Sequence, residues 1–261
     1  MNMEPVRFGV IGCGLMGREF ASVSMRWLHL ACELPRPVIV AACDLSPKNL
    51  DWFRQVPDTK YFYSDYHELL ANPEVEAVYC AVPHHLHAQV YGDVIRAGKH
   101  LIGEKPFGMD LAACEEVEAA MAGRPEVFVR CASEFPFYPA VQQMVKWYRE
   151  GAFGQIIEAR FAIKHSSDMD AANGEYGCMG DLGIHTQHLP FRLGFSPRTV
   201  SAQLANIAKT RPDENGVPVP CETWDNAILM CEAQNTAGDT FPMQLEMKRM
   251  APGCTNTVEY E

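Results

Sequence analysis

The sequence predicts an α/β fold: an N-terminal, doubly wound parallel sheet and a C-terminal α+β domain with a mostly antiparallel, open sheet. Up to about residue 131, short apolar strand patterns alternate with helix patterns, which is typical of a parallel sheet with helices on its faces. After residue 199, three strand patterns follow one another without a helix pattern between them, which indicates antiparallel or mixed pairing. We therefore expect two domains, residues 1–131 and 132–261.

The first strand pattern, residues 6–11, leads into a glycine-rich turn in which Gly12, Gly14 and Gly17 fill the pattern Gly-x-Gly-x-x-Gly. In dinucleotide-binding domains these glycines allow a tight turn, a close approach of the backbone to the pyrophosphate, and packing of the next helix on the strand. The N-terminus of that helix, here expected over residues 18–30, attracts phosphate. We predict a dinucleotide site that also includes Leu15 and Met16; the alternative is an ordinary strand–turn–helix.

An acidic residue follows the second strand pattern, residues 38–43. Asp44 would accept hydrogen bonds from the adenosine ribose and repel a 2′-phosphate, so it favours NAD over NADP as the cofactor. It lies 27 residues after Gly17, whereas about 20 residues are usual. A long helix and the Pro-Arg-Pro turn at residues 35–37 would absorb the difference. The nearby Lys48 keeps NADP open as the less favoured cofactor.

The other elements of the first domain have recognisable boundaries. Pro47 begins a helix, Asp65 offers an N-cap, Pro83 ends a buried strand, and Gly98 suits a C-cap. Three histidines near Pro83 suggest a metal at first sight, yet their side chains would diverge on a strand-to-helix turn. The expected helices cover residues 47–57, 66–70, 88–97 and 111–122, and the expected strands cover residues 60–63, 75–82, 100–103 and 127–131.

The second domain begins with an amphipathic helix pattern that ends at Gly151. Residues 211–220 contain three prolines and read as a surface loop. The last strand pattern, residues 257–261, is cut by the end of the chain, so we expect either a fragment or another element that covers the sheet edge. The remaining expected elements are a helix over residues 139–150, a strand over 156–163, a polar loop over 166–179, a helix over 180–193, and strands over 199–208, 227–233 and 241–247.

The composition limits the partners. A formal net charge of −11 disfavours nucleic acid and anionic membranes, because both carry negative charge. No apolar run is long enough to span a bilayer, and residues 1–5 lack the basic start of a secretory signal. The ten cysteines form no Cys-x-x-Cys pair, which favours reduced, mostly buried thiols. We expect a cytoplasmic protein.

Several motifs occur in one order along the chain. They are the glycine fingerprint, Val-Pro-x-x-x-His at 82–87, Ala-Gly-Lys-His-Leu-Ile-Gly-Glu-Lys-Pro at 97–106, Gly-Ala-Phe-Gly-Gln-Ile at 151–156, Asp-Leu-Gly-Ile-His at 181–185 and Thr-Trp-Asp-Asn-Ala at 223–227. This set resembles the Gfo/Idh/MocA family of NAD(P)-dependent oxidoreductases, the glucose–fructose oxidoreductase and inositol dehydrogenase group. The resemblance implies an N-terminal Rossmann domain, a homo-oligomer formed through the open sheet, and a second domain longer than the one present. This chain has Phe-Pro-Phe-Tyr-Pro at 135–139, where many relatives carry an arginine, so the resemblance extends to the chemistry more than to the substrate pocket.

The resemblance also implies the catalytic residues. Hydride transfer from an alcohol needs a base for the hydroxyl proton. The lysine of Glu-Lys-Pro, Lys105, would hydrogen-bond the reacting oxygen; the alternative is a solvated surface lysine. Asp181 and His185 are spaced i, i+4, so they share one helix face, and the carboxylate would raise the pKa of the imidazole. His185 is the expected acid/base.

Further residues complete the predicted site. Pro83, His84, His87 and Glu104 are expected beside the cofactor, and His188 beside the substrate together with Lys105; packing of His188 in the core is the alternative. No metal is expected, because no further ligands follow at zinc-like separation. The polar loop before the second-domain helix, with Asp168, Asp170, Asn173 and Glu175, would bind sugar hydroxyls or be merely solvated.

We therefore expect an NAD-dependent oxidoreductase that transfers hydride between a sugar or cyclic polyol and nicotinamide. The alternatives are an NAD-dependent glycosidase of the same superfamily and a non-enzymatic regulator that senses NAD(P).

Overall fold

The computed structural model describes residues 3–31, 33–166, 177–213 and 215–261. The chain divides into two compact units, Met1–Ala132 and Ser133–Glu261. The division falls one residue beyond the expected boundary. Within the described residues, no helix combines the length and the apolar composition that crossing a bilayer requires.

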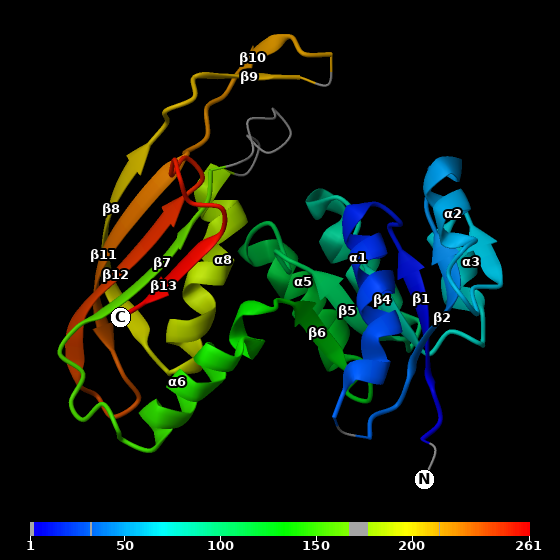
Figure 1. Cartoon of the computed structure of the whole chain (residues 1–261), viewed down its shortest axis with the longest axis horizontal. Helices are drawn as coiled ribbons and strands as arrows, with labels where there is room; N and C mark the ends of the chain where they lie inside the picture. The colour runs from blue at the N-terminus through cyan, green and yellow to red at the C-terminus, as the bar shows by residue number, and fades with distance from the viewer. Residues whose placement is uncertain (1–2, 32, 167–176, 214) are drawn as a thin grey trace. The chain divides into compact units, whose positions relative to one another are not determined.

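The first unit contains a six-stranded sheet in the order β3-β2-β1-β4-β5-β6, and every pair in it is parallel (Figure 1). This confirms the predicted doubly wound sheet. In such a sheet, ligands bind at the carboxyl ends of the strands where the strand order reverses, here beside β1 and β4. The strands are β1 (Val6–Ile11), β2 (Pro37–Cys43), β3 (Tyr61–Tyr63), β4 (Ala77–Cys80), β5 (His100–Glu104) and β6 (Val129–Ala132).

Two helices of the first unit begin at an aspartate whose side chain caps them. The side chain of Asp65 accepts a hydrogen bond from the backbone of His67, and Asp110 caps its helix through the backbone of Ala113. The helix expected over residues 18–30 instead starts directly after Gly14 and gives way to a 3₁₀ helix. The helices are α1 (Leu15–Ser24), η1 (Met25–His29), α2 (Pro47–Phe53), α3 (Tyr66–Ala71), η2 (His84–Leu86), α4 (His87–Arg96) and α5 (Leu111–Ala122).

The second unit contains a five-stranded sheet in the order β13-β7-β12-β11-β8. Only the β7–β12 pair is parallel, which confirms the predicted mixed, mostly antiparallel sheet. The strands are β7 (Ala159–Lys164), β8 (Ser196–Ala205), β11 (Asn226–Gln234), β12 (Thr240–Lys248) and β13 (Thr257–Tyr260). Its helical elements are η3 (Phe135–Phe137), α6 (Pro139–Arg149) and α8 (Gly177–Arg192).

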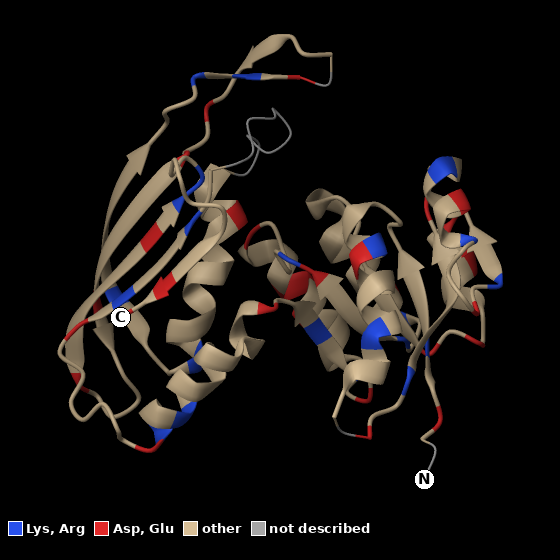
Figure 2. Cartoon of the chain, viewed as in Figure 1, with Lys and Arg blue, Asp and Glu red and all other residues tan. Residues whose placement is uncertain are grey.

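The helices α6 and α8 pack on one face of this sheet (Figure 1). On β12, alternate residues from Phe241 to Met247 are buried and join the core under α8. Residues of both charges lie on the strands of the sheet (Figure 2), where Lys164 pairs with Glu246 and Glu259. One face of the sheet thus builds the core that supports α8.

The prediction of a plain surface loop over residues 211–220 is wrong in one respect. Two short strands, β9 (Thr210–Pro212) and β10 (Pro218–Pro220), pair antiparallel there. Arg211 points inward, is 1% exposed and forms an ion pair with Asp225. Prolines end these strands, so the local sequence reads as a loop, whereas the buried ion pair that anchors the segment joins Arg211 to Asp225, which lies beyond it in the chain.

Candidate functional site

A cavity of about 700 Å³ lies in the first unit, at the carboxyl ends of β1, β2 and β4. Gly12 and Gly14 of the fingerprint, Asp44 after β2 and Pro83 after β4 all line it. These four belong to the cofactor residues expected from the sequence. The cavity is thus at the position where an open parallel sheet binds nucleotides.

The fingerprint glycines leave room that a side chain would remove. Gly12 has φ +90°, and a Cβ there would overlap the carbonyl oxygen of Ala81. A Cβ on Gly17 would overlap the Gly12 carbonyl oxygen, so Gly17 permits close packing of α1. At Gly14, by contrast, nothing described lies within 4 Å of an added Cβ. Together with the N-terminus of α1, which no side chain caps, this space fits a pyrophosphate.

The carboxylate of Asp44 is held by three donors at the cavity wall. The backbone N–H groups of Cys13 and Ser46 each donate to it over 2.7 Å, and the side-chain amide of Asn49 donates over 3.2 Å. Arg18 donates to Asn49 over 3.1 Å and lies over the ring of Trp52. The sequence analysis did not single out Arg18 and Asn49, since a side chain on α1 and one on α2 meet only in the folded unit.

The residues that line this cavity do not include the other expected cofactor residues, which are Leu15, Met16, Gly17, His84, His87 and Glu104. The side chains of Leu15 and Met16 are exposed at the start of α1. His84 lies in η2, with its ring centroid 5.3 Å from that of His87. His87 is fully buried, and its Nδ1 and Nε2 lie 2.6 Å and 3.0 Å from the carbonyl oxygens of Pro106 and Val82. Burial lowers the pKa of His87, although both hydrogen bonds oppose this.

Lys105 follows the last residue of β5 and is joined to Pro106 by a cis peptide bond. The buried Glu104 carboxylate accepts hydrogen bonds from the Tyr79 hydroxyl at 2.6 Å and from the Lys105 backbone N–H at 3.2 Å. In the structure, Glu104 and His87 therefore contact the backbone around Lys105; their contact with a cofactor stays a prediction.

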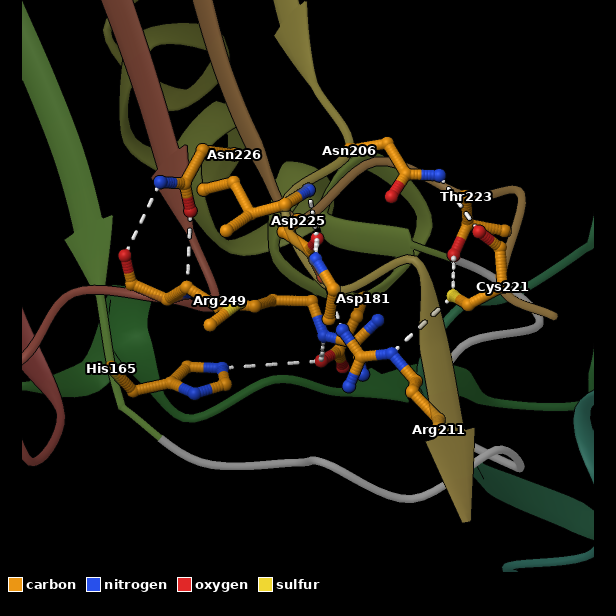
Figure 3. A network of polar contacts seen from close by, with 12 residues as sticks. His165, Asp181, Asn206, Arg211, Cys221, Thr223, Asp225, Asn226 and Arg249 are labelled. Carbon is orange, nitrogen blue, oxygen red and sulfur yellow. Dashed lines mark hydrogen bonds and ion pairs between the residues drawn. The ribbon is translucent and has the colours of Figure 1, made fainter. Parts of the chain in front are cut away.

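Helix α8 of the second unit carries Asp181 and His185 one turn apart. One oxygen of Asp181, Oδ2, lies 3.9 Å from Nε of Arg249 and 4.0 Å from Nε2 of His165 (Figure 3). Arg249 follows β12, is completely buried and comes close to the carboxylate from the sheet side. The sequence analysis missed both partners, because each follows a strand whose pattern carries no sign of a polar neighbour.

The two histidines of α8 are held by the segment before α6. His185 is buried, and its ring packs against Phe135 with 4.6 Å between centroids. His188 Nδ1 lies 2.6 Å from Oγ of Ser133, and burial lowers the pKa of His188. The Phe-Pro-Phe segment is thus in contact with the acid/base expected from the sequence.

A second polar network, centred on Asp225 and Arg211, lies beside Asp181 and Arg249 (Figure 3). Its contacts join parts of the fold to one another. Asp225 is completely buried and accepts hydrogen bonds from the backbone of Ile207 and Ala208 and from Arg211. Arg211 also donates to Cys221 Sγ over 3.3 Å. Burial raises the pKa of the Cys221 thiol, but hydrogen bonds from Thr223 and Arg211 outweigh it and leave the pKa below its usual value.

Two further expectations concern the substrate loop and a bound metal. Asp168, Asp170, Asn173 and Glu175 of the expected substrate loop lie outside the described residues. Among the residues that are described, no group of three or more His, Cys, Asp and Glu side chains is arranged to hold a metal ion.

Comparisons with known proteins agree with this geometry. Residues 6–130 match the GFO_IDH_MocA model, described as an oxidoreductase family with an NAD-binding Rossmann fold. An uncharacterized oxidoreductase of Synechocystis sp. is 31% identical over 208 residues, which are 75% of this chain and 54% of that protein. The trans-1,2-dihydrobenzene-1,2-diol dehydrogenase of Mus musculus is 30% identical over 215 residues, which are 80% of this chain and 62% of that enzyme.

The structure of levoglucosan dehydrogenase in complex with NADH and L-sorbose has the same fold, with a TM-score of 0.87 and 23% identity over 99% of this chain and 70% of that chain. The chain spans about half to three fifths of the length of the two curated relatives. The family model, the relatives and the shared fold give one answer: the chain belongs to the Gfo/Idh/MocA oxidoreductase family, and its first unit is the family's NAD-binding Rossmann fold.

Proposed function

We propose that the protein is an NAD-dependent oxidoreductase that transfers hydride between a secondary alcohol of a sugar or cyclic polyol and nicotinamide. The observation that carries this proposal is the cavity at the fingerprint glycines, with the Asp44 carboxylate fixed in its wall. The names of its relatives support the substrate class: one is a dehydrogenase of a cyclic diol, and another was solved with NADH and L-sorbose.

The cofactor residues have separate tasks in this proposal. The backbone at Gly12 and Gly14 and the N-terminus of α1 bind the pyrophosphate through N–H groups and the helix dipole. Asp44 accepts the ribose hydroxyls, and its negative charge repels the 2′-phosphate of NADP, so we propose NAD as the cofactor. When bound, nicotinamide would supply the hydride acceptor, and the protein's side chains bind the substrate and take up its proton.

The catalytic roles follow from the chemistry of an alcohol. His185 takes the hydroxyl proton, and the Lys105 ammonium stabilises the negative charge that develops on the oxygen. Asp181 binds and orients the reacting groups, and the cationic Arg249 pairs with its carboxylate over 3.9 Å. His188, held by Ser133, binds a neighbouring hydroxyl of the substrate. The cytoplasmic location and the homo-oligomer stay predictions.

A screen for NAD reduction over sugars, inositols and their lactones tests the proposal. Turnover with a rise in nicotinamide absorbance on at least one polyol is expected. Release of an aglycone from a glycoside without net change in that absorbance would instead identify a glycosidase. Tight NAD binding with no turnover, unchanged when Lys105 is replaced by alanine, would identify a regulator.

A further inference from the structure

The backbone on both sides of Lys105 is bonded to one face of α4. The hydroxyl of Tyr91 donates to the carbonyl oxygen of Glu104 over 2.7 Å, and Nδ1 of His87 lies 2.6 Å from the carbonyl oxygen of Pro106. Glu104 precedes the lysine and Pro106 follows it. The carbonyl groups of the residue before Lys105 and of the residue after it thus each have a side-chain partner.

These two side chains pack against each other in the core. His87 and Tyr91 are spaced i, i+4 on α4, both are completely buried, and their rings stack with 4.7 Å between centroids. The other ring nitrogen of His87 lies 3.0 Å from the carbonyl oxygen of Val82, just after β4. The pair therefore connects α4, the end of β4 and the segment after β5, and residues of α4 and of the segment after β4 also line the cofactor cavity.

The fit leaves little freedom at this point. A Cβ on Gly103 would lie 2.6 Å from Cζ of Tyr91, so only glycine lets the tyrosine ring reach over β5 to the next carbonyl. A neutral imidazole has one N–H, so His87 donates to only one of its two carbonyl neighbours at a time. If the two rings served only to fill the core, neither the tyrosine hydroxyl nor the imidazole N–H would be needed.

We propose that His87 and Tyr91 are positioning residues for Lys105: by holding the carbonyls of Glu104 and Pro106 they fix the backbone from which the lysine reaches the reacting oxygen. This inference rests on the proposed function of Lys105. It assigns to the histidine of Val-Pro-x-x-x-His a task in catalysis that requires no contact with cofactor or substrate.

The substitutions Tyr91→Phe and His87→Gln test it, because the first keeps the ring and the second keeps an amide donor. Each is expected to lower kcat about tenfold, the size of one well-placed hydrogen bond, while the Kd for NADH stays within about twofold. Tyr61→Phe is the matched control: it removes a tyrosine hydroxyl of the edge strand β3 that donates to Glu74, away from the β5 segment that carries Lys105, and kcat should not change.

A second measurement does not depend on turnover. In protein labelled with ¹³C at the lysine ε-carbon, the Lys105 signal is identified by its loss in Lys105→Arg, and its chemical shift is followed against pH. Tyr91→Phe should move its titration midpoint or split the signal, and Tyr61→Phe should do neither. An unchanged Lys105 titration together with an unchanged kcat in Tyr91→Phe and His87→Gln would overturn the proposal. It would also be overturned if the loss of kcat in these two variants and in Tyr61→Phe followed only the fall in melting temperature.

The two measurements separate this inference from the proposed function. If the wild-type protein reduces no NAD with any polyol while the variants still shift the Lys105 signal, the proposed function fails and the positioning role stands. If the wild-type protein reduces NAD with a polyol but neither variant changes kcat or the Lys105 signal, the proposed function stands and the positioning role fails. Should His87→Gln fail to fold, Tyr91→Phe decides alone.

Discussion

The backbone N–H of Cys13 donates a 2.7 Å hydrogen bond to the carboxylate of Asp44. This bond ties the glycine turn after β1 to the end of β2, so the group expected to read the ribose is fixed by the turn expected to hold the pyrophosphate. The two halves of the candidate cofactor site therefore share one geometry, and substitutions in either half should affect both.

Replacing Asp44 by serine should weaken NADH binding and reduce the discrimination against NADPH. Loss of hydrogen bonds to a charged group corresponds to a rise in the Kd of NADH of about tenfold to a hundredfold. Fluorescence titration with both cofactors measures this. The control is Asp51→Asn, an exposed carboxylate of α2 paired with Arg54, which should leave both dissociation constants unchanged. An unaltered NADH to NADPH preference in the Asp44 variant would refute the proposed ribose contact.

Gly12→Ala should destabilise the first unit and abolish NAD binding. The new Cβ meets the carbonyl of Ala81 in a backbone conformation with positive φ, so we expect the free energy of unfolding to fall by about 3 to 5 kcal/mol. Gly151→Ala is the matched control, because Gly151 also has positive φ but nothing described lies within 4 Å of an added Cβ. Urea unfolding measures both, and equal losses would show that the contact with Ala81 is unimportant.

Asp225→Asn should be among the most destabilising single substitutions in the second unit. It leaves the buried Arg211 guanidinium without its carboxylate, and breaking a buried ion pair from one side costs about 3 to 5 kcal/mol. The exposed pair between Arg54 and Asp51 gives the comparison, since Arg54→Met should cost about 1 kcal/mol or less. Chemical unfolding of the two variants would contradict this reasoning if their losses were alike.

His188 should make the stability of the second unit depend on pH. Burial lowers its pKa below the 6.5 of a free imidazole, so the unfolded chain binds a proton in a range where the folded chain does not. The stabilisation is therefore fully present above pH of about 6.5 and is lost as pH falls through that value toward the folded-state pKa. Unfolding measured between about pH 5 and 8 should show a smaller slope in His188→Gln than in the wild type, and identical slopes would count against it.

His185→Asn should lower kcat by about a hundredfold to ten-thousandfold, because the substitution removes the group proposed to take the hydroxyl proton. The Kd for NADH should stay within about twofold of wild type, since His185 belongs to the second unit and the cofactor cavity to the first. Steady-state kinetics on the best polyol and fluorescence titration check the two parts. A variant with wild-type kcat would remove His185 from the mechanism.

The sequence by itself determined the class of both sheets, the glycine turn and the place of Asp44. These are local matters: a buried parallel strand needs a continuous apolar run, a turn with positive φ needs glycine, and an acidic residue after β2 lies at the same sheet edge as the turn. Even so, the sequence pattern did not predict that the helix after Gly14 continues as a 3₁₀ helix over Met25–His29.

Only the tertiary structure decided which polar side chains meet. Arg249 and His165 reach Asp181 from the ends of two different strands, and Arg211 reaches Asp225 across a hairpin that reads as a loop. His87 fits the sequence pattern of a helix start, yet folding buries it against the backbone beside Lys105. The partner of a polar residue cannot be identified from the local sequence, because the register of the strands and the packing of helices on them determine which side chains meet.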